Sequence, residues 1–152
     1  MGFNNWAMRV TEADTDAAMV SALGKSGILA NEFTRLLQER EYFRMDVAAF
    51  TQFWPIFDVK DIRKKGLRYK FHGLERKEYV RRMLDAKVKH APTDAFDGEK
   101  PTWSDTIRVI CIVRCNLIHG EKGDASEDVG IVTGAYQTLL GFIDGAELYR
   151  RL

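Results

Sequence analysis

A short stretch in the C-terminal third of the chain holds the polar side chains best suited to chemistry. Arg114, Asn116 and His119 lie in or just after segment 107–118, which is otherwise apolar on nearly every side. A guanidinium keeps its charge at physiological pH, so a buried arginine needs a partner or a solvent-filled cleft. Histidine, with an ordinary pKa of roughly 6.5, can transfer protons near neutral pH. The cluster is therefore either a structural network or a site that binds an anion and moves a proton.

The spacing of Arg114 and His119 limits how such a site can be assembled. Five residues correspond to about 140° around an ideal helix, so the two side chains would not meet on one straight helix. They converge if the last turn relaxes before Gly120, or across a two-fold axis where each protomer contributes its copy. The C-terminal end of a helix also favours the charged form of histidine.

A metal site is the competing interpretation of the same segment. Cys111, Cys115 and His119 form a column at i, i+4 and i+8. Zinc normally takes three or four protein ligands, and His72 and His90 have no ligand spacing relative to this column. We therefore predict no metal and no other cofactor. The cysteines are expected to be free thiols, because two in 152 residues do not make a disulfide scaffold.

The formal net charge of +1 hides an uneven distribution. Segment 60–90 holds twelve Lys or Arg against four Asp or Glu, a net +8, so the remainder sums to −7. Such a basic block is one ingredient of a phosphate-binding surface. A solvated helix face that serves solubility has the same composition, so charge alone leaves both interpretations open.

Apolar residues recur at helical spacing along the chain, and no segment alternates as a strand does. Capping-box patterns at 11–14 and 102–105, and a further cap pattern at Asp124 and Glu127, predict helix starts. Pro55 should kink or break a helix that carries Phe50, Phe53, Trp54 and Phe57, an aromatic cluster that we interpret as core. The prediction is an all-α antiparallel bundle of four to five helices. A single domain would span 1–152, with 1–10 a candidate flexible segment and 91–101 a loop.

The last predicted helix has a stripe of small residues on one face, namely Gly130, Gly134, Thr138, Gly141 and Gly145. Each glycine inside a helix costs roughly 1 kcal/mol relative to alanine, so the stripe needs a reason. Small side chains let another backbone approach closely. The neighbour is expected to be either a helix of the same chain or the same helix of a second copy.

The composition and the distribution of apolar residues also predict where in the cell the protein is found. Hydrophobic residues make up 45% and charged residues 30%, which is ordinary for a globular domain. No run of about eighteen apolar residues is present, so no membrane association is expected. The N-terminal residues lack the pattern of a signal peptide, and with only two cysteines a cytoplasmic location is expected.

Segment 108–122 resembles the R-x4–6-H signature of the HEPN superfamily (higher eukaryotes and prokaryotes nucleotide-binding domains). It is most similar to the variants that read R-N-N-L-x-H-G, as found in abortive-infection and toxin proteins, and it reads Arg-Cys-Asn-Leu-Ile-His-Gly from Arg114 to Gly120. The resemblance implies a small helical bundle, often a homodimer, and in many members a metal-independent ribonuclease. Arg114 and His119 match the family's arginine and histidine. Cys115 stands where the family often has a polar residue.

The resemblance implies a mechanism that uses the substrate's own nucleophile. The 2′-OH of RNA attacks the adjacent phosphate and leaves a 2′,3′-cyclic phosphate. His119 would transfer the proton, Arg114 would stabilise the charge on phosphorus, and Asn116 would orient one of them. Lys122 and part of the basic block, Arg81 and Arg82 in particular, would bind the RNA backbone.

The resemblance leaves a second function open. Some HEPN domains are not enzymes and act as dimerisation modules, or hold a nucleotide or a partner such as a nucleotidyltransferase. The expected partners are therefore RNA and a second copy of the chain, with an antitoxin or a nucleotidyltransferase as further candidates.

Overall fold

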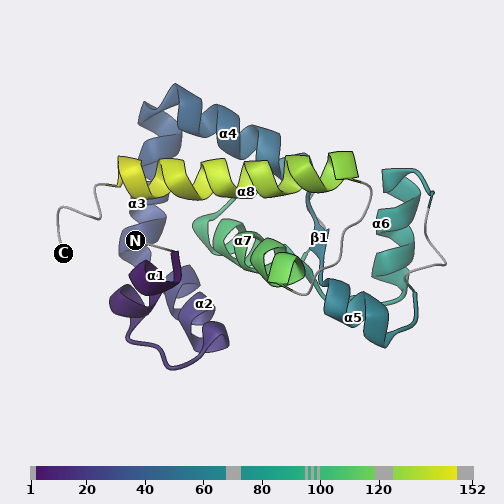
Figure 1. The fold of residues 1–152 in the computed structure, drawn as a ribbon. Coiled ribbons are helices and arrows are strands. Elements are labelled where there is room, and N and C mark those ends of the chain that lie inside the picture. The colour runs from purple at the N-terminus through teal and green to yellow at the C-terminus, as the bar shows by residue number, and fades with distance from the viewer. Residues whose placement is uncertain are drawn as a thin grey trace.

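The protein is mostly helical, as expected. The computed structural model describes residues 3–67, 73–94, 96, 98, 100–118 and 125–146. These residues form eight helices and one two-stranded sheet (Figure 1). The helices are α1 (Phe3–Thr11), α2 (Asp16–Lys25), α3 (Gly27–Glu39), α4 (Glu41–Thr51), α5 (Val59–Lys64), α6 (Arg76–Asp85), α7 (Trp103–Ile118) and α8 (Ala125–Gly145). Strands β1 (Ile56–Phe57) and β2 (His90–Ala91) pair antiparallel, with Ile56 opposite Ala91.

The sequence predicted four to five helices, whereas the described residues form eight. The number is larger because local breaks divide the longer helical segments. Ser26 ends α2 and also caps α3, since its hydroxyl accepts a hydrogen bond from the backbone N–H of Leu29. An extended residue, Arg40, separates α3 from α4. The break expected at Pro55 is present, but β1 rather than another helical turn follows it.

One of the predicted helix caps is wrong and another is confirmed. Thr11 closes α1 instead of opening a helix, and its hydroxyl donates to the carbonyl of Ala7. The true cap of α2 is Thr15, which accepts from the N–H of Ala18. At α7, the backbone N–H of Asp105 donates to the hydroxyl of Thr102, which in turn donates to the Asp105 carboxylate. The cap predicted at Asp124 lies outside the described residues.

The N-terminal residues Phe3–Thr11 form helix α1. Trp6 and Ala7 of α1 are fully buried in a cluster with α2, α3, α7 and α8. Burial of a tryptophan ring removes a large apolar area from water, which ties α1 to the rest of the molecule. After β2, residues of segment 91–101 that are described form no helix, as expected of a loop.

Helix α7 occupies the centre of the molecule and contacts α2, α3, α8 and both strands (Figure 1). Its N-terminal half is buried as predicted, and the Trp103 ring stacks on Phe142 with centroids 4.2 Å apart. The last turn differs from the prediction because it leaves the core. Leu117 and Ile118 are 57% and 65% exposed, so the apolar character of the helix continues beyond the region that packing requires.

The small-residue stripe of α8 packs against α4 of the same chain, with its last glycine against α3 (Figure 1). A Cβ atom added at Gly134 would lie 2.9 Å from a ring carbon of Phe50, and one at Gly130 would lie 2.7 Å from Phe53. Of the two neighbours considered for this stripe, the helix of the same chain is therefore the one present. The aromatic side chains of α4 fill the space that the glycines leave.

Helices α5 and α6 form a small unit with its own apolar cluster, which we call the α5–α6 unit (residues 56–91). Phe57, Ile62, Met83 and Val88 are its buried side chains. The unit adjoins α7 through the two short strands, both of which contact that helix. It lies at the opposite end of the molecule from α1 and α3 in Figure 1.

Candidate functional site

A groove of about 810 Å³ lies where α2, the C-terminal half of α7 and the α5–α6 unit meet. Its lining combines an aliphatic floor, to which Val20 and Ile112 contribute, with charged side chains. Four cations, Lys87, Lys89, Arg108 and Arg114, face two carboxylates, Asp16 and Asp58. Such a concave surface with an apolar floor and an excess of positive charge suits an anionic ligand with an apolar part.

Arg114 is the predicted site residue that the structure places in this groove. Its side chain is 28% exposed, so the guanidinium reaches solvent just beyond the buried part of α7. A guanidinium nitrogen lies 3.5 Å from a carboxylate oxygen of Asp16, at the start of α2. Cys111 and Cys115, the two cysteines of the column that the sequence suggested, also line the groove.

The Asn116 side chain makes two hydrogen bonds to backbone groups of another segment. Its side-chain oxygen accepts a hydrogen bond from the backbone N–H of Val59 at 3.0 Å. Its side-chain nitrogen donates to the carbonyl of Phe57 at 2.9 Å. The amide therefore bridges α7 to the junction of β1 and α5, and it holds the α5–α6 unit against the end of α7. Asn116 does not line the groove.

Lys87 and Lys89, which also line the groove, lie on the segment that follows α6, which we call the wall. This segment is tied to α5, because the N–H of Lys89 donates to the Asp61 carboxylate and the N–H of Asp58 donates to the carbonyl of Lys89. Lys65 pairs with the same carboxylate, and these contacts lower the pKa of Asp61, the Lys65 hydrogen bond most of all. The wall is thus anchored by backbone contacts that leave the lysine side chains in the groove.

His90 lies on the same wall and is held by two backbone carbonyls. Its Nδ1 lies 2.8 Å from the oxygen of Val88, and its Nε2 lies 3.1 Å from the oxygen of Thr93. Both ring nitrogens face backbone carbonyl oxygens of the chain, so neither is directed at a ligand in the groove. These contacts fix the orientation of the His90 ring on the wall.

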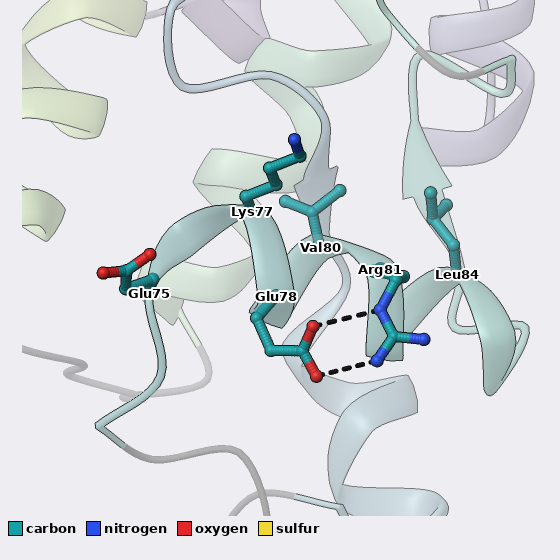
Figure 2. A pocket seen from close by; sticks show the side chains of 6 residues that line it. All are labelled: Glu75, Lys77, Glu78, Val80, Arg81 and Leu84. Atoms are coloured by element: carbon teal, nitrogen blue, oxygen red, sulfur yellow. Dashed lines mark hydrogen bonds and ion pairs between the residues drawn. The ribbon is translucent and has the colours of Figure 1, made fainter.

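Arg81 and Arg82, the two arginines predicted to bind substrate, belong to α6 and do not line the groove. Both pair with Glu78, at 2.8 Å and 2.6 Å (Figure 2 shows the Arg81 pair). These hydrogen bonds lower the pKa of Glu78 to about 2. Their positive charge is partly balanced within the helix. The cations of the groove are instead Lys87 and Lys89 from the basic block and Arg108 and Arg114 from α7.

We expect Glu78→Gln to lower the thermal midpoint slightly, by an amount that depends on pH. The folded pKa of about 2 lies below the ordinary value of 4.5. The Glu78 contribution is therefore fully present above about pH 4.5 and is lost as pH falls through the folded value. Thermal melts of wild type and variant should differ equally from neutral pH to about pH 5, then converge on acidification. Glu75→Gln, which removes no described ion pair, should show no such convergence.

The two cysteines of the groove differ in reactivity. Burial raises the pKa of the Cys111 thiol to about 12, with a smaller contribution from Cys115. Cys111 is 8% exposed and behaves as a small apolar side chain. Cys115 is exposed. It is the one of the two that a reagent entering the groove can reach.

A thiol reagent should therefore modify one cysteine of the native protein quickly and the other only on unfolding. With an aromatic disulfide reagent at neutral pH, we expect Cys115→Ser to abolish the fast phase and Cys111→Ser to leave it intact. Fast labelling of both thiols would contradict the burial of Cys111. A ligand that fills the groove should slow the Cys115 reaction.

Two of the predicted site residues, His119 and Lys122, lie outside the described residues. Sequence reasoning missed Arg108, Lys87 and Asp16 as lining residues, although the helical spacing of Arg108, Ile112 and Cys115 could have indicated a shared face for the first of them. In the described part of the chain, no group of three or more His, Cys, Asp or Glu is placed to hold a metal ion. No described helix is long and apolar enough to cross a membrane.

The fold and the groove together describe a mostly helical protein with a cationic groove beside its central helix. No family model matches the chain, and no curated protein or solved structure matches it significantly.

Proposed function

We propose that the protein is a metal-independent endoribonuclease of the HEPN type, with a toxin or defence role, and that the groove binds the RNA. The observation that carries the proposal is the position of Arg114. The guanidinium reaches a groove with an excess of cations, next to the exposed Cys115, and His119 follows four residues later in the sequence. A fixed guanidinium fork is suited to hold a phosphate and to stabilise negative charge that develops on it.

In the proposed reaction, the 2′-oxygen attacks phosphorus and the bond from phosphorus to the 5′-oxygen breaks. One proton leaves the 2′-OH and one reaches the departing 5′-oxygen, and His119 carries out one of these transfers while solvent water carries out the other. The products are a 2′,3′-cyclic phosphate and a 5′-hydroxyl. Lys87, Lys89 and Arg108 replace Arg81 and Arg82 as the proposed contacts to the flanking phosphates, because they line the same groove as Arg114.

A homodimer remains part of the proposal. Leu117 and Ile118 directly precede His119 and are both more than half exposed. Exposed aliphatic side chains at the end of a buried helix favour contact with another protein surface. A second copy packed there would bring the two histidine-bearing segments together. Arg114 and His119 would then converge across a two-fold axis, which is one of the two ways in which side chains at this spacing can meet.

The test is cleavage of a mixed RNA pool in the presence of EDTA. Wild type should cut and leave cyclic-phosphate ends, and Arg114→Ala should slow the cut by about 100-fold or more. His119→Ala should remove it. Arg9→Ala is the matched control, since it deletes an exposed arginine of α1 outside the groove and should leave the rate unchanged. Cleavage that requires a divalent cation, or that survives both site variants, would overturn the proposal.

One observation favours the alternative, a binding module without catalysis. Both polar atoms of the Asn116 amide bond to backbone groups, so this member of the polar cluster belongs to the structure. The alternative predicts that folded wild type binds RNA or a nucleotide in an Arg114-dependent manner and does not cut. Binding and cleavage measured on the same preparation separate the two functions.

A further inference from the structure

Arg114 already has an anionic partner in this structure, and that partner comes from a distant part of the chain. The Asp16 carboxylate lies 3.5 Å from the guanidinium and is 62% exposed. Asp16 is the first residue of α2, whereas Arg114 lies near the end of α7. Both side chains line the groove. A carboxylate in this position occupies the guanidinium that, under the proposed function, receives the RNA phosphate.

The two carboxylates of the groove differ in their structural duties. Asp58 caps α5, since its carboxylate accepts hydrogen bonds from the N–H groups of Lys60 and Asp61. Asp16 has no comparable duty among the described residues, because the cap of α2 is the hydroxyl of Thr15. The pairing with Arg114 is the one described polar contact of its side chain.

The pair is also weak enough to be exchanged. Ion pairs between partly exposed side chains contribute little, since water and salt screen them. The Asp16 carboxylate meets the guanidinium through one nitrogen at 3.5 Å, whereas the two non-bridging oxygens of an RNA phosphodiester can take both arms of the guanidinium fork. Arg114 therefore gains by exchanging Asp16 for a phosphate, while the freed carboxylate returns to solvent.

We propose that Asp16 is an internal competitor for Arg114, so that RNA must displace the Asp16 carboxylate to reach the site. This inference rests on the proposed function and adds a regulatory contact to it. The carboxylate keeps the arginine oriented in the empty groove and weakens the binding of ligands that cannot replace it. The groove thereby favours phosphate-bearing ligands over weaker anions.

The test measures binding apart from cleavage, with a single-stranded 2′-O-methyl oligonucleotide that lacks the nucleophile. Asp16→Asn preserves the size of the side chain and the Thr15 cap, and it should tighten binding by about two- to five-fold at low salt. Asp14→Asn is the matched control, since Asp14 is an exposed carboxylate two residues before Asp16, in the loop that precedes α2, and it does not line the groove. Arg114→Ala, alone and combined with Asp16→Asn, completes the cycle.

The expected result is a gain for Asp16→Asn that disappears in the Arg114→Ala background, with no change for Asp14→Asn. An equal gain in both aspartate variants, or a gain that persists without Arg114, would show a general field effect and overturn the competitor role. Weaker binding by Asp16→Asn would also overturn it. If wild type binds and Asp16→Asn changes nothing, the competitor is wrong and the RNA site stands. If neither protein binds, both proposals fail.

Discussion

Asn116→Ala is expected to lower the free energy of unfolding by about 2 kcal/mol, because it leaves two backbone groups without their partners. The N–H of Val59 and the carbonyl of Phe57 lie at the junction of β1 and α5, where both bond to the Asn116 amide. Part of the loss is recovered by water, since the side chain is only partly buried. Denaturant unfolding followed by circular dichroism measures the change.

Two further variants make this prediction specific. Asn116→Asp keeps an acceptor for the Val59 N–H but cannot donate to the Phe57 carbonyl, so it should also destabilise the protein. Tyr42→Ala, at a position of α4 that is 85% exposed, should change stability by less than about 0.5 kcal/mol. Unchanged stability in Asn116→Ala, together with loss of RNA cleavage, would return Asn116 to the site role that the sequence suggested.

Gly134→Leu is expected to lower the free energy of unfolding by about 3 kcal/mol, through overpacking between α8 and α4. A Cβ at this position would lie 2.9 Å from a Phe50 ring carbon and 3.3 Å from the Phe50 Cα. A backbone atom cannot rotate aside as a side chain does, so the two helices must separate. Phe50 is fully buried, and its displacement would disturb the second core cluster around Trp54. Denaturant or thermal unfolding measures the loss.

Gly141→Ala serves as the control on the same stripe. Its added Cβ would meet a single atom within 3.4 Å, a ring carbon of Phe43 at 3.1 Å. The ring can shift by a few tenths of an ångström, and alanine gains roughly 1 kcal/mol of helix propensity over glycine. The net change should be small. Equal stability of Gly134→Leu and wild type would mean that α4 does not pack against this face.

The sequence predicted a helix start correctly where long-range packing did not favour a different start nearby. Thr102 and Asp105 precede an apolar helix and form the predicted cap. The same pattern at Thr11 failed, because a buried helix with Trp6 already occupied the preceding residues and the hydroxyl turned back to Ala7. Long-range burial decided between two locally acceptable helix starts, and no single-sequence pattern records it.

The site was predictable only in part for a similar reason. Arg114 could be found because a permanent charge on an apolar helix demands an explanation. Its companions depend on the tertiary fold, since Asp16 comes from α2 and Lys87 follows α6. The basic block predicted that lysines and arginines would contribute to a binding surface, but not which of them would do so. Arg81 and Arg82 form ion pairs with Glu78, whereas Lys87 and Lys89 line the groove.

The contact between α8 and the aromatic side chains beneath it has a consequence for how this chain can vary among its relatives. Each glycine of the stripe is matched by a particular bulky partner: Gly130 by Phe53, Gly134 by Phe50, Gly141 by Phe43 and Gly145 by Leu36. The space at each pair is shared, so a larger residue on α8 requires a smaller one opposite. In an alignment of homologues, the side-chain volumes in each of these four pairs should covary with opposite sign. Together the pairs set the distance of α8 from α4 and, at Gly145, from α3.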